Sequence, residues 1–360
     1  VDRLMGGEVK RRADGGWPLD AIPKASGPLG PTPPRRPWSV RRTTSIDTVW
    51  PGGIGTDLHM SGRGRDLLTG ADPNHPEVLA EDSFTALLSR AREIHELDVT
   101  PVRAGAAALV GSRAGSQLRS AIADALPGDL ASASPLYLLL DDLAGASLVA
   151  AWAWSQWADD WKDRLHSAAE AELKEPVHHK MIGVCVVFSP QSSMVLEGGP
   201  ETQPDLNQPV PDLDNNGDPF GWHQLAAQQG PSARRSRRID VWEEGDVVRA
   251  VTHFQDSAPT PAGGRMAVHE YVVNATIDRA TMTLTGIEAD PRILPFGYCP
   301  AATLNVHELV GAPVGELRER VLAQFAKTQG CTHLNDVLRS LAEVPMLAGR
   351  LERARAAAAG

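Results

Sequence analysis

A repeated pattern constrains the fold of this chain more than any other feature of its sequence. The segment RRTTSID, at residues 41–47, aligns without gaps on RRSRRID, at residues 234–240, and a tryptophan follows each segment closely. About seventy residues later each half contains the tripeptide LVG, and each then has a Leu-Arg pair. Four matches in the same order predict two diverged copies of one unit, rather than two unrelated segments that share common helix words.

The second half shows most clearly what one copy folds into. RIDVWEEGDVVRAVTHF (238–254) and AVHEYVVNATIDRATMTLTGIEA (267–289) each contain two β-rich runs around a turn, which predicts two hairpins. Helical spacing follows in CPAATLNVHELVG (299–311), GELRERVLAQFAK (315–327) and THLNDVLRSLAEV (332–344). We therefore predict an α+β fold of two related halves, each an antiparallel sheet of about four strands followed by helices that cover one face.

Proline-rich segments mark the boundaries of these halves. Residues 1–40 and residues 189–233 each contain seven prolines, which favours extended structure. The predicted organisation is an extended arm (1–40), a diverged N-terminal copy (41–188), a Pro-rich linker (189–233), a C-terminal copy with the candidate site (234–348) and an Ala/Arg-rich tail (349–360).

Composition narrows the class of protein. The chain is 42% hydrophobic and 22% charged, as in a soluble globular protein, and its net charge of −10 argues against a general nucleic-acid binder. The arginine pairs of the repeat are interpreted as a solvated or carboxylate-paired sheet edge. Three cysteines and the lack of a signal-like N-terminus predict a cytoplasmic protein. The apolar runs LYLLL and LVAAWAW are too short to span a bilayer, so we expect no membrane partner.

The two halves differ most in residues that can carry chemistry. GCTHLNDVL (330–338) places Cys331 just before a predicted helix, with Thr332 as the N-cap and His333 in the first turn. Free amides and the helix dipole at that point favour a thiolate. The corresponding positions of the first half carry proline and tyrosine, so we predict that one site survives, in the second half. The alternative is a small buried cysteine at an ordinary helix start.

Three further residues complete the candidate site. Cys299 has no thiol counterpart in the first half. His269 lies on a predicted strand, where alternation places it on the same face as Tyr271 and opposite Glu270. Glu288 ends the next strand. For His269 the alternative is a packed, hydrogen-bonded side chain, and for Glu288 it is a solvated carboxylate.

The second half resembles an uncharacterised bacterial family, domain of unknown function 2889 (DUF2889). The resemblance covers roughly residues 231–348 and depends mainly on GCTHL, with weaker support from VHEY, IEADPR, YCPAA and LVG. The family usually has an acidic or polar residue and then methionine after the strand histidine, whereas Glu270 and Tyr271 follow here. The family implies no activity, and the first half would be a diverged second copy.

The layout of the second half is also similar to the iron–sulfur scaffold fold. Its thiols hold zinc or a cluster, and Cys299, Cys331 and His333 would be the matching positions. The scaffold's first cysteine has no equivalent in this sequence, and the order of histidine and cysteine is reversed. Such a likeness of layout carries little weight for function.

These residues leave three functions open. The leading prediction is an enzyme that acts on a small, largely apolar organic molecule without a cofactor, as an isomerase, lyase or hydrolase. It would work by acid–base or thiol chemistry at Cys331, with His333 or His269 as the base and Glu288 as an orienting carboxylate. The alternatives are a zinc- or iron-binding protein that uses Cys299, Cys331 and His333, and a non-catalytic module whose halves form a ligand cleft. The substrate and the oligomeric state are not readable from the sequence.

Overall fold

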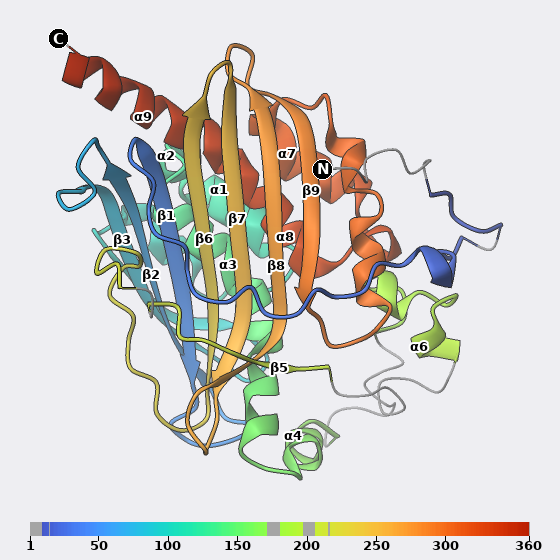
Figure 1. The fold of residues 1–360 in the computed structure, drawn as a ribbon. Coiled ribbons are helices and arrows are strands. Elements are labelled where there is room, and N and C mark those ends of the chain that lie inside the picture. The colour runs from blue at the N-terminus through green and yellow to red at the C-terminus, as the bar shows by residue number, and fades with distance from the viewer. Residues whose placement is uncertain (1–8, 14, 171–180, 197–205, 215–216, 360) are drawn as a thin grey trace.

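One antiparallel sheet forms the centre of the protein (Figure 1). The computed structural model describes residues 9–13, 15–170, 181–196, 206–214 and 217–359. The strand order is β4-β3-β2-β1-β6-β7-β8, and both β5 and β9 pair with the outer edge of β8. The strands are β1 (Ser39–Val49), β2 (Leu58–Thr69), β3 (Glu77–Leu88), β4 (Ile94–Thr100), β5 (Gln208–Val210), β6 (Ser232–Glu244), β7 (Val247–Pro259), β8 (Arg265–Asp278) and β9 (Thr283–Ile293).

Two meanders make up the sheet and meet at their first strands. β1 to β4 form one meander, β6 to β9 form the other, and β1 pairs with β6 along its full length. The predicted α+β class and the two predicted hairpins of the second half are confirmed, with Gly245 at positive φ in the first turn. This strand order is compatible with a duplicated unit, and the duplication itself stays a prediction.

Helices pack on one face of the sheet, and the hydrophobic core lies between the two layers (Figure 1). α3 contacts β1 and β2, α8 contacts β8, and α9 contacts β6. The described α-helices are α1 (Leu118–Ala125), α2 (Pro127–Ala131), α3 (Pro135–Val149), α4 (Trp161–Glu170), α6 (Ser193–Leu196), α7 (Leu317–Gln324), α8 (Thr332–Ser340) and α9 (Val344–Ala359).

One helix prediction for the second half needs correction. The segment 299–311 forms two short 3-10 helices, Cys299–Thr303 and Val306–Leu309, because Asn305 between them leaves the helical backbone region. The predicted boundary between the C-terminal copy and the tail, at residue 348, falls within α9. Leu351 is buried against the core, so this part of the predicted tail is a packed helix.

One helical segment has the length and composition of a membrane span among the described residues. It is Pro135–Gln156, in which α3 continues into a 3-10 helix and joins the two apolar runs that are too short when taken separately. Inside the protein 72% of its most apolar stretch is buried, as is typical of a core helix.

The opposite face of the sheet is crossed by the described part of the N-terminal arm and by residues 206–214 and 217–231 (Figure 1). In the arm, the Leu29 amide donates to Glu270, and the Thr32 hydroxyl donates to the Leu213 carbonyl. The predicted arm and linker therefore cover the sheet, and the linker contributes β5. Parts of both predictions, including residues 197–205 of the linker, lie outside the described residues.

The arginine pairs of the repeat lie at the centre of the sheet, not at an edge. Because β1 pairs with β6, Arg41 contacts Asp240 at 2.5 Å and Arg234 contacts Asp47 at 2.6 Å, so each half supplies one arginine and one aspartate to the other. Carboxylate pairing is confirmed, whereas the prediction of a solvated edge is wrong. Sequence alternation shows which face a residue occupies but not whether its strand is central.

Candidate functional site

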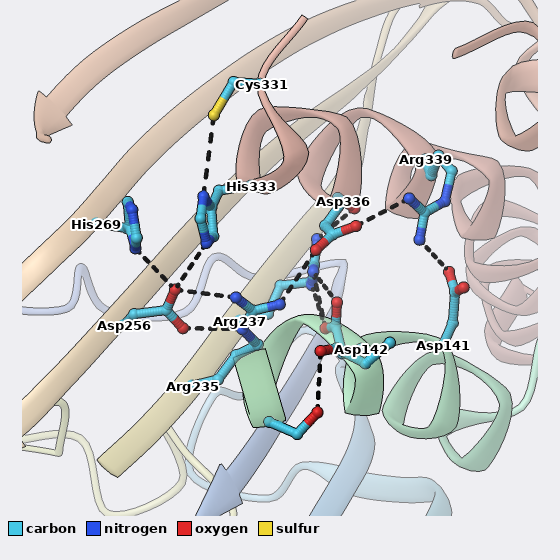
Figure 2. A network of polar contacts seen from close by, with 12 residues as sticks. Asp141, Asp142, Arg235, Arg237, Asp256, His269, Cys331, His333, Asp336 and Arg339 are labelled. Carbon is cyan, nitrogen blue, oxygen red and sulfur yellow. Dashed lines mark hydrogen bonds and ion pairs between the residues drawn. The ribbon is translucent and has the colours of Figure 1, made fainter. Parts of the chain in front are cut away.

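A cluster of two histidines and one aspartate lies between the sheet and α8 (Figure 2). Asp256 on β7 is opposite His269 on β8 in the strand register, and His333 lies in the first turn of α8. Oδ2 of Asp256 is 3.1 Å from Nδ1 of His269 and 3.9 Å from Nε2 of His333. One ligand atom from each residue lies within 4.8 Å of the others, which is the spacing of a potential metal shell.

The two imidazole rings stack on each other. Their centroids are 3.5 Å apart and their planes meet at 22°. Sγ of Cys331 is 3.9 Å from Nδ1 of His333, on the side of the ring away from Asp256 (Figure 2). Nε2 of His333 is buried without a hydrogen-bond partner among the described residues. A buried nitrogen of this kind is costly unless a ligand, an ion or water satisfies it.

Arg235 on β6 holds the carboxylate of Asp256 from the neighbouring strand. Its Nε donates to Oδ1 at 2.8 Å and its Nη2 donates to Oδ2 at 3.0 Å. Burial alone would raise the pKa of Asp256, but Arg235 and His269 outweigh burial and bring the pKa below its usual value. Asp256 is therefore a buried carboxylate that stays ionised.

His333 is a neutral imidazole at neutral pH. Burial lowers its pKa well below the usual value, and the stacked His269 lowers it further. Neutral imidazole offers one nitrogen lone pair, which is the form that binds a metal or accepts a proton.

A buried charge network supports the cluster and joins the two halves. Arg235 donates from Nη1 to Asp336 on α8 at 3.1 Å, and Arg339 of the same helix donates to Asp336 at 2.8 Å. Arg339 also donates to Asp141 on α3 at 2.8 Å, as Figure 2 shows. Strand β6 and helices α3 and α8 are thus linked through fully buried ion pairs, which restricts the movement of the site residues.

Cys331 is placed near His333, as the sequence suggested, but not as a thiolate. It is itself the N-cap of α8 and its side chain makes no capping bond, so the prediction of Thr332 as N-cap is wrong by one residue. Burial raises the pKa of Cys331, although the amides of His333 and Leu334 oppose the shift. The expected activation by the helix start is therefore outweighed by desolvation.

The other two cysteines share this apolar environment. Burial and the neighbouring Cys331 raise the pKa of Cys299 well above its usual value and raise the pKa of Cys185 to about 12. Cys299 and Cys331 belong to one hydrophobic cluster with Tyr271, whose pKa burial and the thiols also raise. The group that could hold a metal is instead formed by the two histidines and Asp256.

Glu288 lies away from the cluster. It is an exposed residue of β9 opposite Asn274, and Asn274 points away from the face that carries His269 and Tyr271. The expectation that Glu288 orients the site needs correction, because its side chain is exposed and away from the histidines. The residues that the sequence analysis missed are Asp256 and Arg235, and the signal for Asp256 was a lone carboxylate in the β-rich run VTHFQDSA.

Comparison with known families finds a match for the region that contains this cluster. Residues 233–347 match the family model described as Protein of unknown function (DUF2889). The match begins in β6 and ends in α9, so the DUF2889 region contains every residue of the cluster. The family resemblance seen in the sequence is confirmed for this region, and the match does not extend to the first half. No curated protein and no solved structure matches the chain.

Proposed function

We propose that the DUF2889 region binds a divalent transition-metal ion, zinc or ferrous iron, through Asp256, His269 and His333. The observation that carries this proposal is the unpartnered Nε2 of His333 beside an ionised carboxylate and a second imidazole. Two histidines and one carboxylate are the protein ligands of several catalytic zinc sites and of non-haem iron sites, both of which keep open positions.

The distances require only a small rearrangement on binding. Ligand atoms about 2.1 Å from one ion lie roughly 3.0–3.5 Å apart, and the Asp256–His269 pair is already at 3.1 Å. Nε2 of His333 starts 3.9 Å from Asp256 Oδ2 and has to approach by less than about 1 Å. Because the stacked rings have nearly parallel planes, one ring must also tilt before both lone pairs can meet at one point. His269 would release its Nδ1 proton.

A neighbour of the ligands would hold one of them in place. Arg235 would act as the outer partner that orients the ligating carboxylate. When bound, such an ion supplies Lewis acidity and an acidic bound water.

A second candidate is acid–base catalysis at His269, the enzyme activity that the sequence favours. The hydrogen bond from His269 Nδ1 to Asp256 is the contact by which a carboxylate orients a catalytic imidazole. The thiol version of this enzyme has less support, because burial keeps Cys331 protonated. Chemical modification separates the versions: a catalytic thiol would react with iodoacetamide in the folded protein at pH 8, and we expect Cys331 to react only after unfolding.

Metal analysis of the full chain, purified without chelator, tests the proposal. We expect about one equivalent of zinc or iron, or its uptake by apo protein in titrations, and a loss of at least tenfold in metal affinity in His333→Gln. The matched control is His307→Gln, the same change at an exposed histidine of the same half. Metal-free wild-type protein that takes up neither ion, or equal uptake by both variants, would disprove the proposal.

A further inference from the structure

A second candidate site lies on the opposite face of the sheet, where β1 and β6 meet under the N-terminal arm. A cavity of about 220 Å³ lies there between Pro33 and Pro34 of the arm and residues of β1, β6 and β7. Its lining includes Arg41 and Arg238, which occupy neighbouring positions on the two central strands. The site therefore draws on both halves of the protein and is separated by the sheet from the histidine cluster.

Arg238 lines this cavity and has one unsatisfied donor. The side chain is 2% exposed, and its Nε donates to Asp240 at 2.7 Å. Its Nη1 is buried and has no hydrogen-bond partner among the described residues. In Arg41, by contrast, each side-chain nitrogen has an acceptor, namely Asp240 or the carbonyl of Pro33 or Gly221. A buried guanidinium with a free donor calls for an acceptor inside the cavity.

The remaining walls add positive charge and an aromatic surface. Arg36, an exposed residue of the arm, lies 4.4 Å from the ring centroid of Trp242. Three arginines thus line the cavity against a single carboxylate, Asp240. Glu270 also acts on Arg238 from outside the lining, and even with it three arginines face two carboxylates. This excess occurs in a chain whose net charge is −10.

We propose that this cavity binds a small organic anion through a carboxylate or phosphate group that accepts from Arg238 and Arg36. Arginine donors suit both head groups, because each presents oxygens at the spacing of the guanidinium fork. The volume of about 220 Å³ admits the head group and a short carbon skeleton. This inference does not depend on metal binding at the other face, and it gives the two halves a shared ligand site.

Isothermal titration calorimetry on the full chain, with inorganic phosphate and succinate at matched ionic strength and chloride as reference, tests the inference. We expect at least one of the two probes to bind, and which one binds distinguishes a phosphate ester from a carboxylic acid. Arg238→Met should weaken that binding about tenfold or more, since it removes a charged hydrogen bond. Arg320→Met, which removes one charge on α7 in the helix layer, should change the affinity less than about twofold.

A second pair of variants keeps the test decisive if Arg238→Met does not fold. Val251→Phe fills the cavity from β7 without removing a charge, and Arg36→Ala changes an exposed residue of the arm. Loss of binding in Val251→Phe and weaker binding in Arg36→Ala are the expected results. The inference fails if neither probe binds more tightly than chloride, or if Val251→Phe binds as wild type does.

Discussion

Two arginine–aspartate pairs occupy equivalent places on the helix-facing side of the sheet. Arg42 on β1 donates to Asp66 on β2 through Nε and Nη2, both at 2.6 Å. Arg235 on β6 donates to Asp256 on β7 in the same two-fold manner, at 2.8 and 3.0 Å. In each case the two residues are directly opposite in the strand register. The same ion pair is therefore built once in each half.

The surroundings of the two pairs differ in one strand and one helix. In the first half, β3 places Ala80 opposite Asp66. In the second half, the corresponding strand β8 places His269 opposite Asp256. Asp66 also accepts from Arg350 of α9, so its remaining capacity is filled by a second arginine. Asp256 instead faces two imidazoles. A buried carboxylate satisfied by arginines is a structural ion pair, and the same carboxylate beside two histidine side chains is a candidate ligand.

The largest expected effect comes from neutralising either carboxylate. Asp66→Asn and Asp256→Asn each leave a buried guanidinium short of a partner, which should cost about 3–5 kcal/mol of the free energy of unfolding. Urea denaturation of metal-free protein measures this loss. Only Asp256→Asn should also reduce bound metal. If Asp66→Asn removes the metal to the same extent, the two pairs do not differ in the way we infer.

Core truncations in the two helices come next. Leu334 on α8 and Leu139 on α3 are both fully buried, so Leu334→Ala and Leu139→Ala should each cost about 2–5 kcal/mol. Because Leu334 adjoins His333 in α8, only its truncation should also weaken metal affinity. Thermal melts together with metal titrations check both statements. Equal metal affinity in the two variants would show that packing of α8 does not position His333.

A pH effect of intermediate size should distinguish the second half. His333 is neutral in the folded protein because its pKa is lowered, whereas in the unfolded chain it titrates near 6.5. Acidification therefore favours the unfolded state, and between pH 7.5 and pH 5 this residue should remove about 2 kcal/mol of stability. His333→Leu should lose this dependence in apo protein. Denaturation of wild type and variant at both pH values measures this dependence. If both proteins lose the same stability between pH 7.5 and pH 5, His333 is protonated in the folded protein at the lower pH.

The smallest effect is expected at the cysteine. Cys331→Ser should change stability by no more than about 1 kcal/mol, because serine is a good N-cap and offsets the lost apolar contact at the start of α8. Metal content should stay at the wild-type level, since the thiol is not among the proposed ligands. Metal loss in a variant that melts normally would instead make Cys331 a fourth ligand.

Much of the local structure was predictable because it depends on short-range patterns. Alternation around Gly245 and around residues 278–281 predicted the hairpins, and the same alternation placed His269 beside Tyr271 and away from Glu270. The start of α8 was predictable to within one residue from its apolar spacing. Each of these features is determined by residues within about ten positions of one another.

The candidate site itself depends on contacts between distant segments. Asp256 and His333 are 77 positions apart, and only the pairing of β7 with β8 and the packing of α8 bring them within 3.9 Å. The charge state of Cys331 was mispredicted for a similar reason. A helix start favours the thiolate, but the apolar core that surrounds this residue comes from other elements and opposes it.

By itself, then, the sequence of this protein determined which segments become strands and helices, which faces their side chains occupy, and which family its second half resembles. Only the tertiary structure decided that the arginine pairs are central and buried, that Glu288 is remote, and that Asp256 joins the two histidines. The reason is that strand order, burial and pKa depend on which segments become neighbours, and these neighbours are set by long-range packing.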